Sequence, residues 1–293
     1  MREFKINYHF IFGMAVLFTV ITTAPAPAVA IGTIDTFDVQ ATGMVDGMGG
    51  VAEQRLEINN FNETAFSWYQ SPAGDTSVLG GYRDVYLQGV AGNLQTTVGV
   101  NTQRLGDGRT GELSFSSASG VQSKVTVSYD GDDMSSDIDH SGLGGVDLTH
   151  AGESNGVLFT MPEVDHPMNL LITIWQNGEG GQKASQYLNE IGVVDNGDPA
   201  LQKFVAFSDF VIAEGVQAPV MDFSDVGAVA FEYNAPLSPG GSTTAALDFR
   251  VDSVQKAGNF IPEPASAVSF LIGSLGLCYF EAFRQRRKRR GMR

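Results

Sequence analysis

Hydrophobic and polar residues alternate over short runs along most of this chain. Between residues 31 and 254 the runs are about five to nine residues long, and Gly, Asn, Asp and Ser separate them. Every second position is apolar in four of these runs, at residues 84–90, 113–115, 123–129 and 203–207. This alternation is typical of strands with one buried face.

Two other runs, residues 169–175 and 226–231, are apolar almost throughout, which predicts central strands buried on both faces. About twelve such strand candidates predict an all-β fold, an antiparallel β-sandwich of the jelly-roll type with two six-stranded sheets. A helix is suggested only at residues 183–190. The alternative is a pair of immunoglobulin-like sandwiches, split near residues 130–156.

The pattern of the first 30 residues predicts a secretory signal peptide. Arg2 and Lys5 precede an apolar run at residues 10–21, and Ala28 and Ala30 provide a small-residue cleavage site for signal peptidase. An uncleaved membrane anchor is the alternative. Cleavage would leave residues 31–258 as the exported β-sandwich domain.

Residues 259–293 have a different composition from the rest of the chain. Pro262, Glu263 and Pro264 precede an apolar run at residues 265–280, and six basic residues follow at 284–290. Sixteen apolar residues are close to the length that a membrane-spanning helix needs. The basic residues would stay in the cytoplasm, which leaves the preceding domain outside. An ordinary single-pass anchor is the alternative.

This order of elements resembles the PEP-CTERM sorting signal of exported bacterial proteins. The resemblance implies processing by an exosortase-type transpeptidase, and a role beside exopolysaccharide in the biofilms of Gram-negative bacteria. A second, weaker resemblance to exported PEP-CTERM proteins covers three short segments, residues 80–84, 129–131 and 222–229. It implies one continuous domain and no particular activity.

Charge and cysteine content limit the functions that the domain can have. The whole chain has a net charge of −15, but the part between the two terminal signals has 9 basic and 30 acidic residues, a net charge of −21. This charge excludes binding to nucleic acid phosphates; it favours solubility or the binding of divalent cations. The single cysteine, Cys278, lies in the apolar tail, so the domain contains no disulfide.

An acidic segment is the best candidate for a metal site. Its carboxylates could offer the hard oxygen ligands that Ca²⁺ prefers, although their spacing does not match an EF-hand. The candidate calcium ligands are Asp130, Asp132, Asp133, Asp137 and Asp139. The alternative is a loop that is simply exposed to solvent.

Three aromatic residues are candidates for stacking against the rings of a glycan: Trp68, Tyr69 and Trp175. Burial in the core is the alternative for each of them. Trp68 and Tyr69 lie in a polar segment, whereas Trp175 ends an apolar run. We therefore expect Trp68 to be more exposed than Trp175.

No catalytic motif stands out in the sequence. There is no nucleophile elbow and no zinc-binding helix motif, and His140, His150 and His166 lie in polar segments. A glycosidase needs only two carboxylates, which the sequence alone cannot select. We therefore expect a non-enzymatic structural or adhesive protein of the cell surface or biofilm matrix, with a carbohydrate-binding module as the alternative and a glycoside-acting enzyme after that.

Overall fold

The structure is a computed structural model of the chain. It describes residues 28–38, 54–71, 75–100, 111–133, 135–178, 183–195, 197–212, 221–236 and 241–259. Most of the expected signal peptide and all of the sorting segment after Asn259, with Pro262, Glu263 and Pro264, lie outside these residues. Within the described ranges, no helix is long and apolar enough to cross a membrane.

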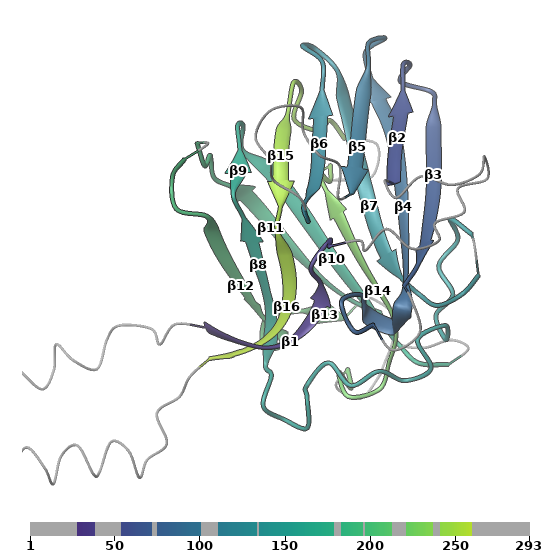
Figure 1. The fold of residues 1–293 in the computed structure, drawn as a ribbon, viewed down its shortest axis with the longest axis vertical. Coiled ribbons are helices and arrows are strands. Elements are labelled where there is room, and N and C mark those ends of the chain that lie inside the picture. Colours follow the sequence, from purple (N-terminus) through teal and green to yellow (C-terminus); the bar gives the residue numbers. More distant parts are fainter. Residues whose placement is uncertain are drawn as a thin grey trace, which may run out of the picture. The chain divides into compact units, whose positions relative to one another are not determined.

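The described strands form three antiparallel sheets (Figure 1). The seven-stranded sheet has the order β13 (Val211–Ile212), β11 (Lys183–Ile191), β10 (Met168–Gln176), β14 (Val226–Tyr233), β7 (Gln122–Tyr129), β4 (Tyr82–Ala91), β3 (Thr64–Gln70). The five-stranded sheet has the order β2 (Gln54–Ile58), β5 (Thr96–Val100), β6 (Leu113–Ser117), β15 (Asp248–Val251), β9 (Glu163–Val164). The four-stranded sheet has the order β1 (Ala28–Asp35), β16 (Ser253–Asn259), β8 (Gly156–Met161), β12 (Leu201–Ala206). Two short 3₁₀ turns, η1 (Leu79–Gly81) and η2 (Phe207–Asp209), connect strands.

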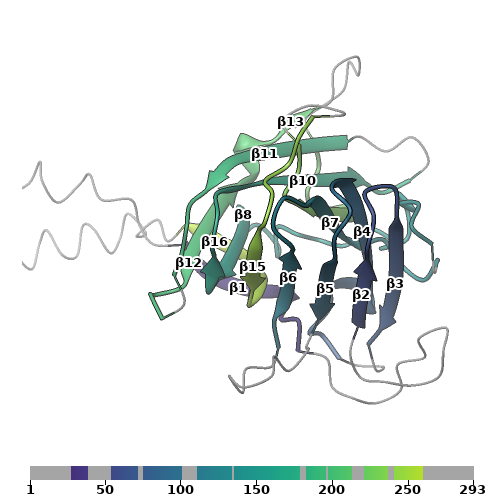
Figure 2. The same ribbon diagram turned by 90° about the horizontal axis from the view of Figure 1, so that it is seen from above.

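The five-stranded and four-stranded sheets form one layer. Only Asp252 separates β15 from β16, and only Pro162 separates β9 from β8. Proline cannot donate a hydrogen bond to a neighbouring strand, so Pro162 interrupts the pairing and the layer bends there. Figure 2 shows this layer opposite the seven-stranded sheet.

Aromatic side chains from both layers fill the space between them. Phe159 of β8 meets Phe231 of β14 edge to face, with ring centroids 5.2 Å apart. Phe249 of β15 stacks on Tyr233 of β14 at 5.3 Å and on Phe115 of β6 at 4.9 Å. All five side chains are buried. The fold is therefore an all-β antiparallel sandwich with a continuous core, as the alternation predicts.

Three details differ from the sequence-based expectations. The sheets have seven, five and four strands, because one layer is divided at the bend. Residues 183–190 form most of strand β11 and are not helical, because they pair along their length with β10. The division near residues 130–156 is wrong, since β7 pairs with β14 and β6 pairs with β15 across it.

Ala28 and Ala30, the predicted signal cleavage residues, lie at the start of β1. They are less buried than the end of the strand, where Ile34 and Asp35 are inaccessible to solvent. Cleavage after Ala30 would leave residues 31–35 to pair with β16. The cleavage position stays a prediction.

Candidate metal centre

Strands β4 and β7 lie side by side in the seven-stranded sheet, with Asp84 opposite Ser128. Successive side chains of a strand point to opposite faces of its sheet. Arg83 and Tyr129 therefore point into the core, whereas Asp84 points to the outer face, and Asp130 follows the end of β7. The same two strands thus supply polar groups to both sides of the sheet.

The inner group is a buried ion pair. Nη1 of Arg83 donates to both carboxylate oxygens of Asp35, at 2.9 and 2.8 Å. The hydroxyl of Tyr129 donates to Oδ2 of Asp35 at 2.7 Å, and the backbone N–H of Phe37 donates to Oδ1 at 2.7 Å. All four residues are fully buried. The group fixes the end of β1 to the seven-stranded sheet.

The outer group consists of Asp84, Asp130 and Asp133. One carboxylate oxygen from each lies within 4.8 Å of the other two. Asp84 is 4% exposed and Asp130 is 1% exposed, whereas Asp133 is partly exposed. Oδ2 of Asp84 and Oδ1 of Asp130 are buried and accept no hydrogen bond from the described chain. Each of these two nearly buried carboxylates thus has one oxygen without a hydrogen-bond donor among the described residues.

The electrostatics of this group are those of an uncompensated negative charge. Burial, followed by the negative charge of Asp130, raises the pKa of Asp84 to about 8. Burial, followed by the charge of Asp133, raises the pKa of Asp130 to about 6, although the backbone N–H of Asp139 donates to its Oδ2 at 3.2 Å. No basic side chain is among the causes that act on either pKa. With a pKa of about 8, the Asp84 carboxyl is largely protonated at neutral pH when no cation is bound.

The segment between β7 and Val146 packs against the outer face of the sheet. The backbone N–H of Leu143 donates to the carbonyl of Gly227 at 2.9 Å, and Val146 exchanges two hydrogen bonds with Val226, at 2.8 and 3.0 Å. The ring of His140 stacks on Trp175 with centroids 5.4 Å apart. These contacts hold the segment that carries Asp133 against the sheet.

Glycines permit this close packing. A Cβ at Gly227 would collide with the carbonyl oxygen of His140, and one at Gly142 would collide with that of Asp130. Gly131 has φ +91°, a conformation in which side chains are strained, and a Cβ there would collide with the backbone of Gly142. The backbone of the segment therefore approaches both Asp130 and β14 more closely than other residues would allow.

The three carboxylates fit a calcium ion. Calcium binds oxygens at about 2.3–2.6 Å, so ligands on opposite sides of the ion are about 5 Å apart. The 4.8 Å limit on the carboxylate oxygens lies within this span. The oxygens that lack a donor could bind such an ion directly, and a positive ion would remove the electrostatic cause of the raised pKa values.

The structure places the other predicted calcium ligands differently. Asp132 is exposed and accepts a hydrogen bond from the hydroxyl of Tyr82, whose pKa is raised by partial burial and then by this charge. Asp137 is exposed. Asp139 accepts hydrogen bonds from the backbone N–H and the hydroxyl of Ser141, at 2.9 and 2.8 Å, which lower its pKa. Of the five predicted ligands, only Asp130 and Asp133 belong to the cluster.

Asp84 is the member of the cluster that the loop alone does not reveal. It lies in β4, in a run that the sequence assigns to a strand. One signal could have revealed it: the weaker resemblance to exported PEP-CTERM proteins covers both segments 80–84 and 129–131, and each has an aspartate directly after a residue of the inner group. The fold brings these two aspartates together.

The aromatic candidates for glycan stacking lie in three different environments. Tyr69 points into the core, is 3% exposed and lies under the guanidinium of Arg83 at 5.0 Å, so its assignment to glycan stacking is wrong. Trp175 is 8% exposed and lies beneath His140, so a sugar cannot reach its face. Trp68 is partly exposed on the outer face, directly opposite Asp84 in the neighbouring strand.

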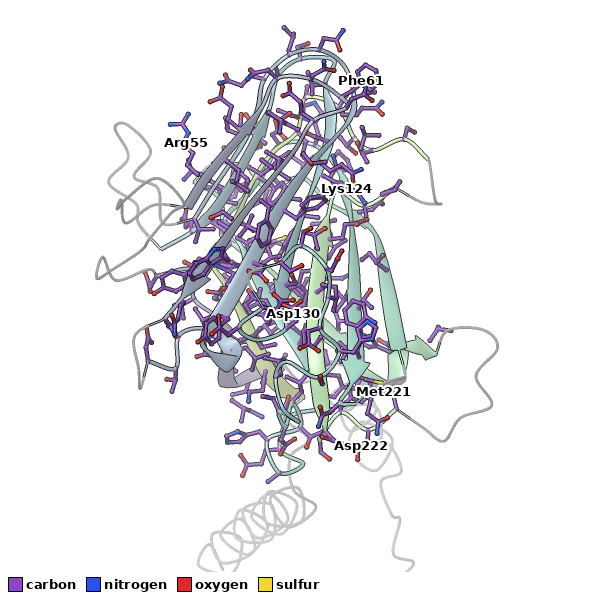
Figure 3. The ribbon with its side chains drawn as sticks, turned by 90° about the vertical axis from the view of Figure 1, so that its right-hand side faces the viewer. Arg55, Phe61, Lys124, Asp130, Met221 and Asp222 are labelled. Atoms are coloured by element: carbon purple, nitrogen blue, oxygen red, sulfur yellow. The ribbon has the colours of Figure 1, made fainter. Side chains whose placement is uncertain are left out.

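Beyond Trp68 the outer face stays partly open. Phe66 lies opposite Tyr86, and Tyr86 lies opposite Thr126; all three are partly exposed. Nζ of Lys124 pairs with Glu232 at 2.6 Å across this face. Figure 3 shows Lys124 and Asp130 on the same side of the molecule, one at each end of β7.

Comparisons with known proteins identify no family. No family model matches the chain, and no curated protein matches it either. Nine chains of solved structures align with it, among them the following three. A family 11 carbohydrate-binding module from Clostridium thermocellum, in complex with a β-1,3-1,4-mixed-linked tetrasaccharide, has a TM-score of 0.28 and 13% identity, over 68% of this chain and 93% of that chain. The family 11 module of the cellulosomal cellulase Lic26A-Cel5E from Clostridium thermocellum has a TM-score of 0.28 and 12% identity, over 80% and 94% of the two chains.

The structure of PfGH50B has a TM-score of 0.30 and 10% identity, over 50% of this chain and 21% of that chain. At these values, the alignments show neither a shared family nor a shared ligand.

Proposed function

We propose that this protein is a non-enzymatic, exported β-sandwich of the jelly-roll type that binds Ca²⁺ through Asp84, Asp130 and Asp133. One observation supports this proposal above the others. Two nearly buried carboxylates each have an oxygen without a donor among the described residues, and no basic side chain is among the causes that act on their pKa values. Buried charges are otherwise paired or bound to metals.

The cation would join β4, the end of β7 and the segment after it. A bound cation would stabilise this domain, which has no cysteine and a net charge of −21, because it neutralises buried negative charge where no disulfide is available. Extracellular calcium modules work with dissociation constants of about 10⁻⁴–10⁻³ M. The site would therefore be filled outside the cell.

Isothermal titration of the purified protein with CaCl₂ at pH 7.5 tests the metal site. We expect one equivalent of Ca²⁺ to bind, and binding to be lost in Asp84→Asn because this variant keeps the shape but removes the charge. Asp137→Asn changes an exposed aspartate outside the cluster and should bind as the wild type does. Equal binding by the wild type and Asp84→Asn would place the calcium elsewhere.

Export and sorting form the second part of the proposal, and the sequence supports them. Signal peptidase would release the N-terminus near Ala30, and an exosortase-type transpeptidase would process the tail at Pro262, Glu263 and Pro264. The mature domain would then serve a structural or adhesive role in an exopolysaccharide matrix. Mass spectrometry of the protein from its native host tests this: a C-terminus near residues 262–264 supports processing, and an intact Arg293 contradicts it.

A second candidate function is carbohydrate binding on the outer face of the seven-stranded sheet. The observation that favours it is the partly exposed row of aromatic side chains there, from Trp68 and Phe66 to Tyr86. Aromatic rings offer the apolar surface that a sugar ring needs. This candidate needs no catalytic residues.

A further inference from the structure

We propose that the calcium centre and Trp68 form a single glycan-binding site. In this site, vicinal hydroxyls of a neutral polysaccharide complete the coordination of the cation, and the neighbouring sugar ring lies on the indole of Trp68. The inference rests on the calcium binding proposed above. It adds the class of ligand and the residues that would contact it.

The first support is the position of Trp68 relative to Asp84. The two residues are direct partners in the β3–β4 pair, so their side chains lie on the same face of the sheet. The Cβ atoms of such partners are about 4.5–5.5 Å apart. A ligand that touches the cation therefore reaches the indole without a change in the sheet.

The second support is the incomplete set of protein ligands. Calcium binds six to eight oxygens, whereas the cluster contains three carboxylates. Asp84 and Asp130 close its inner side, and Asp133 is partly exposed, so the cluster opens to solvent at Asp133. Hydroxyl oxygens of a ligand can take the remaining positions from this side.

The third support is the polar rim beside the centre. Nε2 of Gln70 donates to the hydroxyl of Tyr82 at 2.7 Å, and this hydroxyl donates to Asp132. Gln70 and Tyr82 are the pair next to Trp68 and Asp84 on the same face. They also line a cleft of about 500 Å³ together with Asp75 and Lys256. A sugar chain that passes the cation would find hydrogen-bonding groups there.

The charge around the site selects for a neutral glycan. Asp84, Asp130, Asp132 and Asp133 lie together, and the domain as a whole is strongly acidic. One Ca²⁺ does not neutralise four carboxylates, so an anionic polysaccharide would be repelled. A sugar with vicinal cis hydroxyls, which can bind one ion through two oxygens, fits best.

Affinity electrophoresis of the full-length protein through gels that contain soluble mannan, a glycan with cis 2,3-hydroxyls, tests this inference. We expect mannan to retard the wild type in 5 mM CaCl₂, about the concentration that saturates such sites, and EGTA to abolish the retardation. Trp68→Ala should lose at least tenfold in affinity while it still binds calcium in titration calorimetry. Phe61→Ala removes another exposed aromatic side chain (Figure 3) and should behave as the wild type does.

The outcomes separate the two proposals. Calcium binding without retardation by mannan overturns the glycan site and leaves the metal centre standing. Retardation that persists in EGTA overturns recognition through the cation. Gels that contain polygalacturonate, an anionic glycan, give a further comparison. Retardation by polygalacturonate but not by mannan overturns the choice of a neutral glycan. Absence of calcium binding overturns the proposed function itself.

Discussion

At the scale of single residues, neighbouring positions of one strand serve opposite faces of the sheet. Arg83 joins the buried group around Asp35, and Asp84 belongs to the outer carboxylate cluster. Tyr129 and Asp130 repeat this arrangement at the end of β7. Because the two groups share strands, a change in the inner one is expected to displace the outer one.

The inner group gives a prediction about stability. Asp35→Asn leaves the Arg83 guanidinium buried without its counter-charge, so we expect the free energy of unfolding to fall by about 3–5 kcal/mol. Denaturation with urea measures this loss. Tyr129→Phe removes one hydrogen bond to the same carboxylate and should cost less, about 1.5–3 kcal/mol. A loss below about 1 kcal/mol in Asp35→Asn would contradict a structural role for the pair.

Sequence reasoning selected the acidic segment but not the ligand set. Proximity in the chain favoured Asp132, Asp137 and Asp139, because carboxylates in one loop could converge on one ion. Their side chains instead point to Tyr82, to solvent and to Ser141. The pairing of β4 with β7 places Asp84 beside Asp130, and the alternation of apolar residues does not predict which strands pair.

At the scale of elements, the segment of residues 131–146 decides whether the cluster can form. It is fixed by backbone hydrogen bonds to β14 and by the stacking of His140 on Trp175. Its close approach depends on Gly227, where a Cβ would collide with the His140 carbonyl.

Gly227→Ala is therefore expected to move the segment away from the sheet. We expect a calcium affinity at least tenfold weaker and a loss of stability of about 1–3 kcal/mol, the usual range for overpacking. Titration calorimetry and thermal unfolding measure the two effects. Gly192→Ala is the matched control, because a Cβ there meets nothing within 4 Å. Unchanged affinity in Gly227→Ala would show that the segment does not hold the ligands.

Alternation in the sequence predicted the strands better than it predicted the sheets. Residues 123–129 fall within β7, and 226–231 within β14, whose positions are nearly all buried as an apolar run implies. The register that pairs Trp68 with Asp84, and the break at Pro162 that divides one layer, depend on long-range contacts. Such contacts leave little trace in a local pattern.

At the scale of the whole molecule, the strongly acidic charge and the outer carboxylate cluster both make the stability of the fold depend on pH. The folded protein binds protons at Asp84 and Asp130 up to about pH 8 and pH 6, whereas the unfolded chain releases them near pH 4. The folded state therefore binds more protons between these limits, and its stability must fall as the pH rises. Calcium replaces the protons, so it should stabilise the protein most at pH 8.

Thermal unfolding of the wild type and Asp84→Asn from pH 5 to pH 8.5, in EGTA and in 5 mM CaCl₂, about the level that fills extracellular sites, tests the central claim most directly. In EGTA the wild-type Tm should fall with rising pH more steeply than that of Asp84→Asn. Calcium should raise the wild-type Tm by several degrees at pH 8, by less at pH 5, and not at all in Asp84→Asn. Equal calcium responses of the two proteins, or none in either, would contradict a calcium centre at Asp84, Asp130 and Asp133.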